Sequence, residues 1–141
     1  MTIRTAQPEE YGALVDIWER SVRASHHFLK EEDFKKIKAE MPHCYLPSVD
    51  LYVIETDGRI VGFLGLSHST IEMLFIDADS FGRGFGSALI NFALAKNVCK
   101  VDVNEQNTQA LAFYTSKGFK IVARDECDSD GRPYPILHLS R

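Results

Sequence analysis

The sequence predicts a single mixed α/β domain, in which helices cover both faces of a central mixed sheet of about seven strands. Its 141 residues are 45% hydrophobic and 26% charged, which suits one compact core and leaves little room for a second. A strand, a helix and another strand follow one another between residues 70 and 104. Parallel strands need such a crossover, and crossovers place helices against the sheet. We therefore expect residues 1–141 to form one domain with about four helices.

The N-terminal elements follow from the spacing of apolar residues. Residues 2–6 predict a short first strand, and Pro8 begins a helix because proline fits the first helical position. The apolar positions of this helix recur at helical spacing and are Tyr11, Leu14, Val15, Trp18 and Val22. A second, more charged helix is expected over residues 30–41. Two prolines within residues 42–47 predict an irregular segment after it.

The remaining elements alternate between strands and helices. Asp57 and Gly58 separate two apolar runs within residues 51–68, which predicts a hairpin with a tight turn. A fourth strand is expected at residues 70–77, directly before a glycine-rich stretch. The elements expected after it are a helix at 85–96, a strand at 99–104, a helix at 107–117, and two closing strands at 119–124 and 135–140.

Composition excludes several classes of protein. The net charge is −4 and no block of lysine and arginine stands out, so nucleic acid is not an expected partner. The N-terminus lacks the apolar core of a signal peptide, and no apolar run is long enough to span a membrane. We expect a cytoplasmic protein without a membrane partner. Three widely spaced cysteines predict neither a disulfide framework nor a zinc site, and no metal is expected.

The stretch "DADSFGRGFGSAL", residues 77–89, places glycines at alternate positions before an apolar helix. Its spacing matches neither the dinucleotide fingerprint nor the P-loop, which needs a lysine. Bare backbone at a strand-to-helix junction leaves N–H groups unobstructed and adds the positive end of the helix dipole. This arrangement suits a pyrophosphate. The alternative is a flexible loop whose glycines only permit tight packing.

Two motifs carry a family resemblance. The run "LFIDADSFGRGFGSALINFAL" resembles the acyl-CoA-binding motif of the GCN5-related N-acetyltransferase (GNAT) superfamily, and "NTQALAFYTSKGF" resembles its second signature, N-x-x-A-x-x-F-Y-x-x-x-G-F. The order of elements across the whole chain also resembles that of the family. More narrowly, "RSVRASHHFL" and "GRPYPILHL" are similar to the YjaB-type bacterial acetyltransferases. The resemblance implies a GNAT fold and acetyl-CoA as the co-substrate.

The resemblance also implies a reaction. It points to direct transfer of an acetyl group to a primary amine in a ternary complex, and the YjaB-type stretches point to a lysine of a protein or peptide. A small amine, such as a polyamine, an amino acid or an aminoglycoside, is the alternative acceptor. A non-catalytic acetyl-CoA sensor is the third hypothesis, because Phe81 stands where the family pattern has Gln or Arg. Arg83 lies close enough in sequence to replace part of the lost contact.

Residues that would bind the co-substrate follow from the motif positions. The family's fourth strand bulges and pairs with the pantetheine arm, and a free N–H there, of Leu74 or Phe75, would stabilise the oxyanion. Asn107 is either a helix cap or a contact to the same arm. The residues assigned to co-substrate binding are Leu74, Phe75, Ile76, Arg83, Gly84, Phe85, Gly86, Ser87 and Asn107. For Phe85 we expect the side chain to pack in the core and only its N–H to act.

Acetyl transfer also needs groups that move protons. An alkylamine with a pKa near 10.4 is neutral in roughly one molecule per thousand at pH 7, so a proton acceptor is needed. Glu72 and Asp102 are the candidates for this base, although each could be a plain solvated carboxylate. Tyr114 matches the family tyrosine that faces the sulfur and would assist the leaving thiolate. His26 would contact the acceptor. Oligomeric state is not readable from the sequence, and a homodimer stays open.

Overall fold

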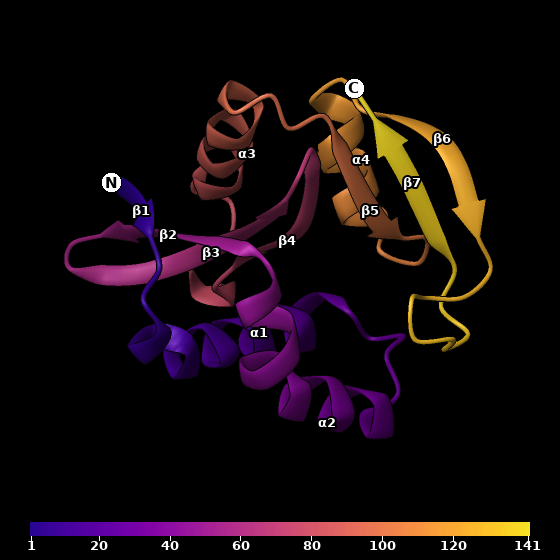
Figure 1. Cartoon of the computed structure of the whole chain (residues 1–141), viewed down its shortest axis with the longest axis horizontal. Helices are drawn as coiled ribbons and strands as arrows, with labels where there is room; N and C mark the ends of the chain where they lie inside the picture. Colours follow the sequence, from indigo (N-terminus) through magenta and orange to yellow (C-terminus); the bar gives the residue numbers. More distant parts are fainter.

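The computed structural model describes all 141 residues. It contains one seven-stranded mixed sheet with helices on both faces (Figure 1), which confirms the predicted fold class. The strands are β1 (Thr2–Thr5), β2 (Asp50–Thr56), β3 (Arg59–Ser67), β4 (Thr70–Ile76), β5 (Lys100–Asn104), β6 (Lys120–Asp125) and β7 (Ile136–Ser140). The α-helices are α1 (Tyr11–Ser25), α2 (Glu31–Glu40), α3 (Phe85–Ala95) and α4 (Thr108–Ser116).

The strands lie in the order β1-β2-β3-β4-β5-β7-β6. Every neighbouring pair is antiparallel except β4 and β5, which are parallel and connected through α3. The β2–β3 hairpin turns at Asp57 and Gly58, which have φ angles of 53° and 73°. Left-handed conformations at both central residues are characteristic of the type I′ turn that Asp-Gly favours. The hairpin predicted from the sequence is therefore present.

Two hydrophobic clusters lie on opposite faces of the sheet. One packs α3 and α4 against the sheet and includes Leu89 and Leu64, both fully buried. The other packs α1 and α2 against the sheet and includes Leu14 and Phe63, also fully buried. Leu64 and Phe63 are adjacent in β3, so their side chains point to opposite faces, as a pleated strand requires. The two clusters account for the helical layers on each side of the sheet.

A bulge in β4 changes which face its side chains occupy. Leu66 pairs with Ile71 but Gly65 pairs with Met73, so Glu72 is an extra residue without a partner on β3. In a regular strand Ile71 and Met73 would share a face. Here Ile71 belongs to the cluster beneath α3 and α4, whereas Met73 packs against the other cluster. The bulge therefore rotates the rest of β4 by one residue.

The parallel pair between β4 and β5 is short. Only Thr70 with Lys100 and Ile71 with Val101 are in register, and the two strands then separate (Figure 1). The separation begins at the bulge residue Glu72. The sheet consequently opens between its four-stranded and three-stranded parts, and this opening positions the candidate site.

The segment expected to be irregular is helical instead. A short π-helix (Met41–Tyr45) and a 3₁₀ turn (Leu46–Ser48) continue directly from α2. The prolines do not prevent this, because each occupies the first or second position of its turn, where no intrahelical N–H is needed. Met41 and Leu46 are 2% and 0% exposed. Their burial beneath α1 stabilises a helical segment that local sequence rules disfavour.

Candidate active site

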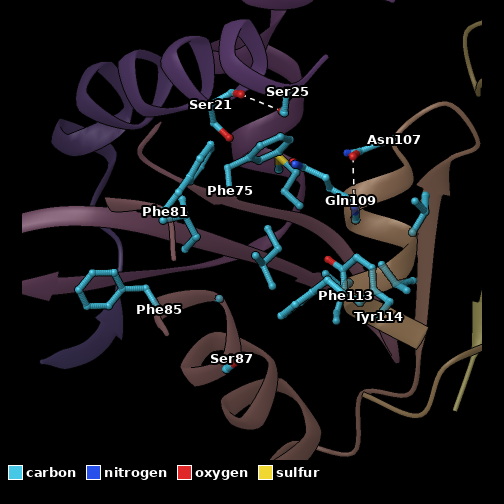
Figure 2. Close-up of a pocket in the computed structure, with 18 of the residues that line it drawn as sticks. Ser21, Ser25, Phe75, Phe81, Phe85, Ser87, Asn107, Gln109, Phe113 and Tyr114 are labelled. Atoms are coloured by element: carbon cyan, nitrogen blue, oxygen red, sulfur yellow. Dashed lines mark hydrogen bonds between the residues drawn. The ribbon is translucent and has the colours of Figure 1, made fainter. Parts of the chain in front are cut away.

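A cavity of about 640 Å³ lies where β4 and β5 separate (Figure 2). Its walls come from α1, β4, the glycine-rich connection, α3, β5 and α4. The predicted site residues that line it are His26, Glu72, Leu74, Phe75, Ile76, Gly84, Phe85, Gly86, Ser87, Asp102, Asn107 and Tyr114. Arg83 is the one predicted site residue that does not line the cavity. The fold thus gathers residues from distant parts of the sequence, and their individual roles remain predictions.

The connection between β4 and α3 carries a row of unpaired backbone donors. We call residues Gly82–Ser87 the glycine loop. None of its N–H groups donates to another group of the protein, partly because the first turn of a helix has no preceding carbonyls to serve. A Cβ placed on Gly84 would meet no protein atom within 4 Å, so the space before α3 is open. Free donors and the helix dipole together fit a pyrophosphate.

Two of the three glycines are required by backbone conformation. Gly82 and Gly84 have φ angles of 75° and 85°, a left-handed region that costs other residues about 1–2 kcal/mol. Gly86 lies within α3, and a Cβ there would stand 3.6 Å from the Phe113 ring, an ordinary contact. The loop conformation therefore depends on Gly82 and Gly84 more than on Gly86.

Arg83 and Phe85 pack against each other outside the opening. The Arg83 guanidinium carbon lies 5.3 Å from the centroid of the Phe85 ring, and Phe85 is 6% exposed within the core beneath α3. Core packing of the Phe85 side chain was expected. The Arg83 side chain does not line the cavity. Its position therefore adds no support to the prediction that it replaces part of the contact of the family's Gln or Arg.

Phe81 stands at the edge of the cavity beside the glycine loop (Figure 2). Its side chain is 45% exposed, although a phenylalanine is normally buried in a protein of this size. An apolar ring therefore occupies the place where the family pattern has a polar side chain. Any contact made there with a bound co-substrate is a packing contact, because phenylalanine has no hydrogen-bonding group.

The β4 backbone offers a second set of free groups. Pairing with β5 ends at Ile71, so the edge of β4 that faces β5 has no strand partner from Glu72 to Ile76. All of these residues line the cavity. The expected bulge exists, but its extra residue is Glu72 rather than Leu74 or Phe75, which keep regular register with β3. The bulge lies earlier in β4 than expected, at the point where β4 separates from β5.

Tyr114 presents a hydroxyl to the cavity from α4 (Figure 2). Its ring is 6% exposed and makes edge contacts with Phe113 and Phe119, at centroid distances of 5.2 and 5.7 Å. The Tyr114 hydroxyl has no hydrogen-bond partner in the protein. Every fully buried polar side-chain atom does have one, so this oxygen is not fully buried and reaches the cavity. Burial raises the pKa of Tyr114, which keeps the hydroxyl protonated.

Two carboxylates line the cavity near the start of β4, whereas the glycine loop follows the end of this strand. Glu72 projects from the bulge, and Asp102 projects from β5 with 48% of its side chain exposed. Partial loss of hydration, together with the negative charge of Asp102, raises the pKa of Glu72. A carboxylate with a raised pKa is a better proton acceptor than an ordinary one. The electrostatics of this end therefore suit proton removal.

A chain of hydrogen bonds connects α4 to α1 beside the cavity. Asn107 accepts from the N–H of Ala110 at 3.1 Å and so caps α4. Its Nδ2 lies 3.3 Å from Nε2 of His26, whose Nδ1 lies 2.8 Å from the Ser25 hydroxyl. That hydroxyl donates its only hydrogen to the carbonyl of Ser21. It follows that His26 Nδ1 donates to Ser25 and His26 Nε2 accepts from Asn107.

This chain defines the state of His26. Its Nε2 lone pair is already engaged by Asn107, and burial, with a contribution from His27, lowers the pKa of His26 to about 4. The ring is therefore neutral near pH 7. To accept a proton it would have to release Asn107. His26 lines the cavity as predicted, but these contacts favour a structural connection over a proton acceptor.

Sequence reasoning missed several cavity residues. These are Ser21, Ser25, Met73, Ser80, Gln109 and Phe113, among others. Ser21 and Ser25 continue the apolar stripe of α1 at helical spacing, and Ser21 is 5% exposed. A small polar residue on an apolar helix face was the available signal for both. Phe113 is part of the second motif, so its position beside Tyr114 could also have been anticipated.

Neither a metal centre nor a membrane span is found. The structure contains no group of His, Cys, Asp and Glu side chains arranged to bind a metal ion. None of its helices combines the length and apolar character needed to cross a membrane.

Comparison with known proteins identifies the fold family. The family model described as "Acetyltransferase (GNAT) domain" matches residues 47–121. The chain is 41% identical to the peptidyl-lysine N-acetyltransferase YjaB of Salmonella typhimurium, over 99% of this chain and 97% of that protein. It is 40% identical to the protein of the same name from Escherichia coli, over 99% and 96%.

Solved structures agree. The solution structure of apo-form YjaB from Escherichia coli superimposes with a TM-score of 0.90, at 40% identity, over 99% of this chain and 95% of that one. The PaiA N-acetyltransferase of Thermoplasma acidophilum, solved in complex with coenzyme A, has a TM-score of 0.72 at 17% identity, over 99% and 98%. The chain therefore belongs to the GNAT family of N-acetyltransferases.

Proposed function

We propose that this protein transfers the acetyl group of acetyl-CoA directly to lysine side chains of proteins or peptides, in the cytoplasm. Relatives named peptidyl-lysine N-acetyltransferases, about 40% identical over the full chain, support the acceptor class. The observation that carries the proposal is the cavity itself. It joins unpaired backbone donors at the glycine loop to two carboxylates at the other end.

The glycine loop and β4 would hold the co-substrate. The N–H groups of Gly84 to Ser87 suit the pyrophosphate, because anions are favoured at an unpaired helix N-terminus. The free edge of β4 at Leu74–Ile76 suits the amide-containing pantetheine arm, which can pair with it like a strand. Asn107 has one Nδ2 hydrogen left for the same arm after its contacts with His26 and Ala110. The chemistry that acetyl-CoA supplies is an activated acetyl thioester.

Glu72 would accept the proton that the acceptor ammonium must lose. The pKa of Glu72 is raised and is therefore closer to the pKa of an amine than that of an ordinary carboxylate is. Proton transfer from the ammonium group to Glu72 is less uphill for this reason. Asp102 would stabilise the ammonium group before this transfer. Both carboxylates lie on the side of the cavity remote from the glycine loop, where an incoming amine can meet the acetyl group.

Backbone and tyrosine groups would stabilise the negative charges that develop. A β4 N–H on the edge facing β5 could donate to the carbonyl oxygen of the acetyl group, and one such donor is worth about 3–4 kcal/mol. The Tyr114 hydroxyl could donate to the departing sulfur. Burial that raises the pKa of Tyr114 raises that of a thiol in the same place, so the hydrogen bond remains well matched.

Exposure of the carboxylate end favours a protein acceptor over a small amine. The Asp102 side chain is 48% exposed and Glu72 is also accessible. A site that selects a small amine usually encloses its ligand. A lysine side chain on a larger molecule needs only an open approach to the same groups.

A turnover assay with several acceptors tests the proposal. Release of free thiol from acetyl-CoA is measured with lysine peptides, with peptides offering only an α-amine, and with polyamines, and mass spectrometry locates the acetyl group. We expect lysine Nζ acetylation to dominate. Dominant acetylation of polyamines would transfer the assignment to the small-amine class. Acetyl-CoA binding without any turnover would identify a sensor.

A further inference from the structure

A cluster of titratable groups lies on the exposed face of β5, β7 and β6. His138 stands in the middle of β7, opposite Asp102 on β5 and Ala123 on β6. Its Nδ1 lies 2.6 Å from Oδ1 of Asp102, and its Nε2 lies 2.6 Å from Oδ2 of Asp125. Strand register therefore fixes one imidazole between two carboxylates, and one of these carboxylates lines the cavity.

Hydrogen counting defines the charge of this cluster. Ionised carboxylates only accept hydrogen bonds, so both ring nitrogens of His138 must donate. A neutral imidazole carries a single N–H, and the arrangement therefore requires the imidazolium form. The hydrogen bonds to Asp125 and Asp102 raise the pKa of His138, in agreement with this count. The cluster keeps His138 charged over a wider pH range than that of a free histidine.

The two neighbouring strands add other charged groups, and Lys120 lies on this face of β6, opposite Ser140. Lys100 lies on the same face of β5, two residues before Asp102, and Glu72 approaches Asp102 from β4. The neighbours of His138 on its own strand that share this face are uncharged. The Asp102, His138 and Asp125 side chains are 48%, 32% and 69% exposed. Asp102 alone connects the cluster to the cavity, so any effect of His138 on the reaction passes through Asp102.

We propose that His138 is a positioning residue for the acceptor: by holding Oδ1 of Asp102, it leaves Oδ2 directed at the cavity, where the lysine ammonium group binds. This rests on the proposed function. No bond is made or broken by His138. Its part is to hold the Asp102 carboxylate in one rotamer, which a partly exposed aspartate otherwise lacks.

This role has a specific pH dependence. As pH rises through the pKa of His138, the ring keeps one N–H for two carboxylates. Asp102 is then held only part of the time, and acceptor binding weakens while the amine itself becomes easier to deprotonate. The loss is therefore measured as a ratio of kcat/KM between two proteins: wild type, which has a titrating side chain at residue 138, and a variant that has none.

The test uses two variants of the full chain. His138→Asn keeps an amide N–H near the place of Nδ1 but does not titrate, and His138→Leu has no donor. The acceptor is a blocked Gly-Lys-Gly peptide, and kcat and KM are measured for the peptide and for acetyl-CoA from pH 6 to 9. Thermal unfolding of each variant identifies any general loss of stability.

We expect His138→Leu to lower kcat/KM for the peptide about tenfold, the size of a lost charge-assisted hydrogen bond, mainly through the peptide KM. Acetyl-CoA KM should be unchanged. His138→Asn should recover most of the loss. Its kcat/KM relative to wild type should rise as the pH passes the raised pKa of His138, which lies above the ordinary histidine value of about 6.5.

Two results would overturn the inference. One is a His138→Leu protein that matches wild type at every pH, and the other is a His138→Asn protein whose ratio to wild type is independent of pH. If His138→Leu does not fold, the pH dependence of the ratio between His138→Asn and wild type still tests the inference. Failure of the proposed function looks different, because then wild type itself does not acetylate the lysine peptide.

Discussion

The two ends of the cavity are built in different ways. At the glycine loop the proposed functional groups are backbone N–H groups, and their direction depends on left-handed conformations at Gly82 and Gly84. Elsewhere in the cavity the proposed functional groups are the side chains of Glu72, Asp102 and Tyr114, which come from three elements. The first end therefore depends on local conformation, and the second depends on strand register and packing between distant segments.

The largest expected effect is at the backbone end. Gly84→Val should weaken acetyl-CoA binding at least about 100-fold, because a β-branched residue resists the left-handed conformation and its side chain fills the open space before α3. Isothermal titration with acetyl-CoA measures the change.

Gly58→Val is the matched control for this strain. Gly58 has a φ angle of 73°, and a Cβ placed on it would also meet nothing within 4 Å, but it lies in the β2–β3 turn away from the cavity. We expect lower thermal stability and unchanged acetyl-CoA affinity. Equal losses of affinity in both variants would mean that Gly84 acts through stability alone.

At the side-chain end, Tyr114→Phe should lower kcat about 10- to 100-fold, the lower part of the range for a positioned proton donor. Acetyl-CoA affinity should stay within about twofold, because the ring and its packing remain. Tyr52→Phe serves as the control, since Tyr52 packs on Phe92 outside the cavity. An unchanged kcat in Tyr114→Phe would remove this hydroxyl from the mechanism.

Glu72→Gln tests the proton acceptor and has a pH signature. Glu72 must be ionised to act, and its pKa is raised, so wild type should lose its advantage as pH falls through that pKa. We expect Glu72→Gln to be about tenfold slower at neutral pH and to approach wild type in acid. Glu105→Gln, at a surface ion pair with Arg124, should match wild type throughout. A pH-independent ratio would exclude Glu72 as the base.

The smallest expected effect concerns the hydrogen bonds that connect α1 to α4 through His26. His26 has a folded-state pKa of about 4, below its ordinary value of 6.5, so the unfolded chain binds a proton in this interval and the folded chain does not. Wild type should lose stability relative to His26→Gln as pH falls from about 6.5 to 4. Urea midpoints measured across this range, with His27→Gln as control, test the direction. Parallel pH profiles would contradict the buried, neutral state of His26.

The sequence predicts the backbone groups of the glycine loop better than it predicts the side chains elsewhere in the cavity. Glycine spacing before an apolar helix identified the loop whose N–H groups are unpaired, since glycine marks unusual backbone directly. The bulge was expected two or three residues too late, because Met73–Ile76 is uniformly apolar and hides the switch of faces. The contact of the Arg83 guanidinium with the Phe85 ring could not be predicted, because no local rule describes it.

His138 could not have been found from local pattern. It is one polar residue in an alternating closing strand, and its partner Asp102 lies 36 residues earlier. Their contact exists because β7 inserts between β5 and β6 in antiparallel register. That order of strands departs from the order of the chain, so only the assembled sheet brings the two side chains together.

The short pairing between β4 and β5 has a consequence for how such a site can change. Two residue pairs are too few to fix the angle between the two parts of the sheet. The cluster beneath α3 and α4 contains residues of both parts, such as Leu64 and Val103, so side-chain volume there sets this angle. A substitution in that cluster can widen or narrow the cavity while the glycine loop and the carboxylates keep their sequence. Such a substitution would change the width of the cavity without changing the residues that are proposed to react.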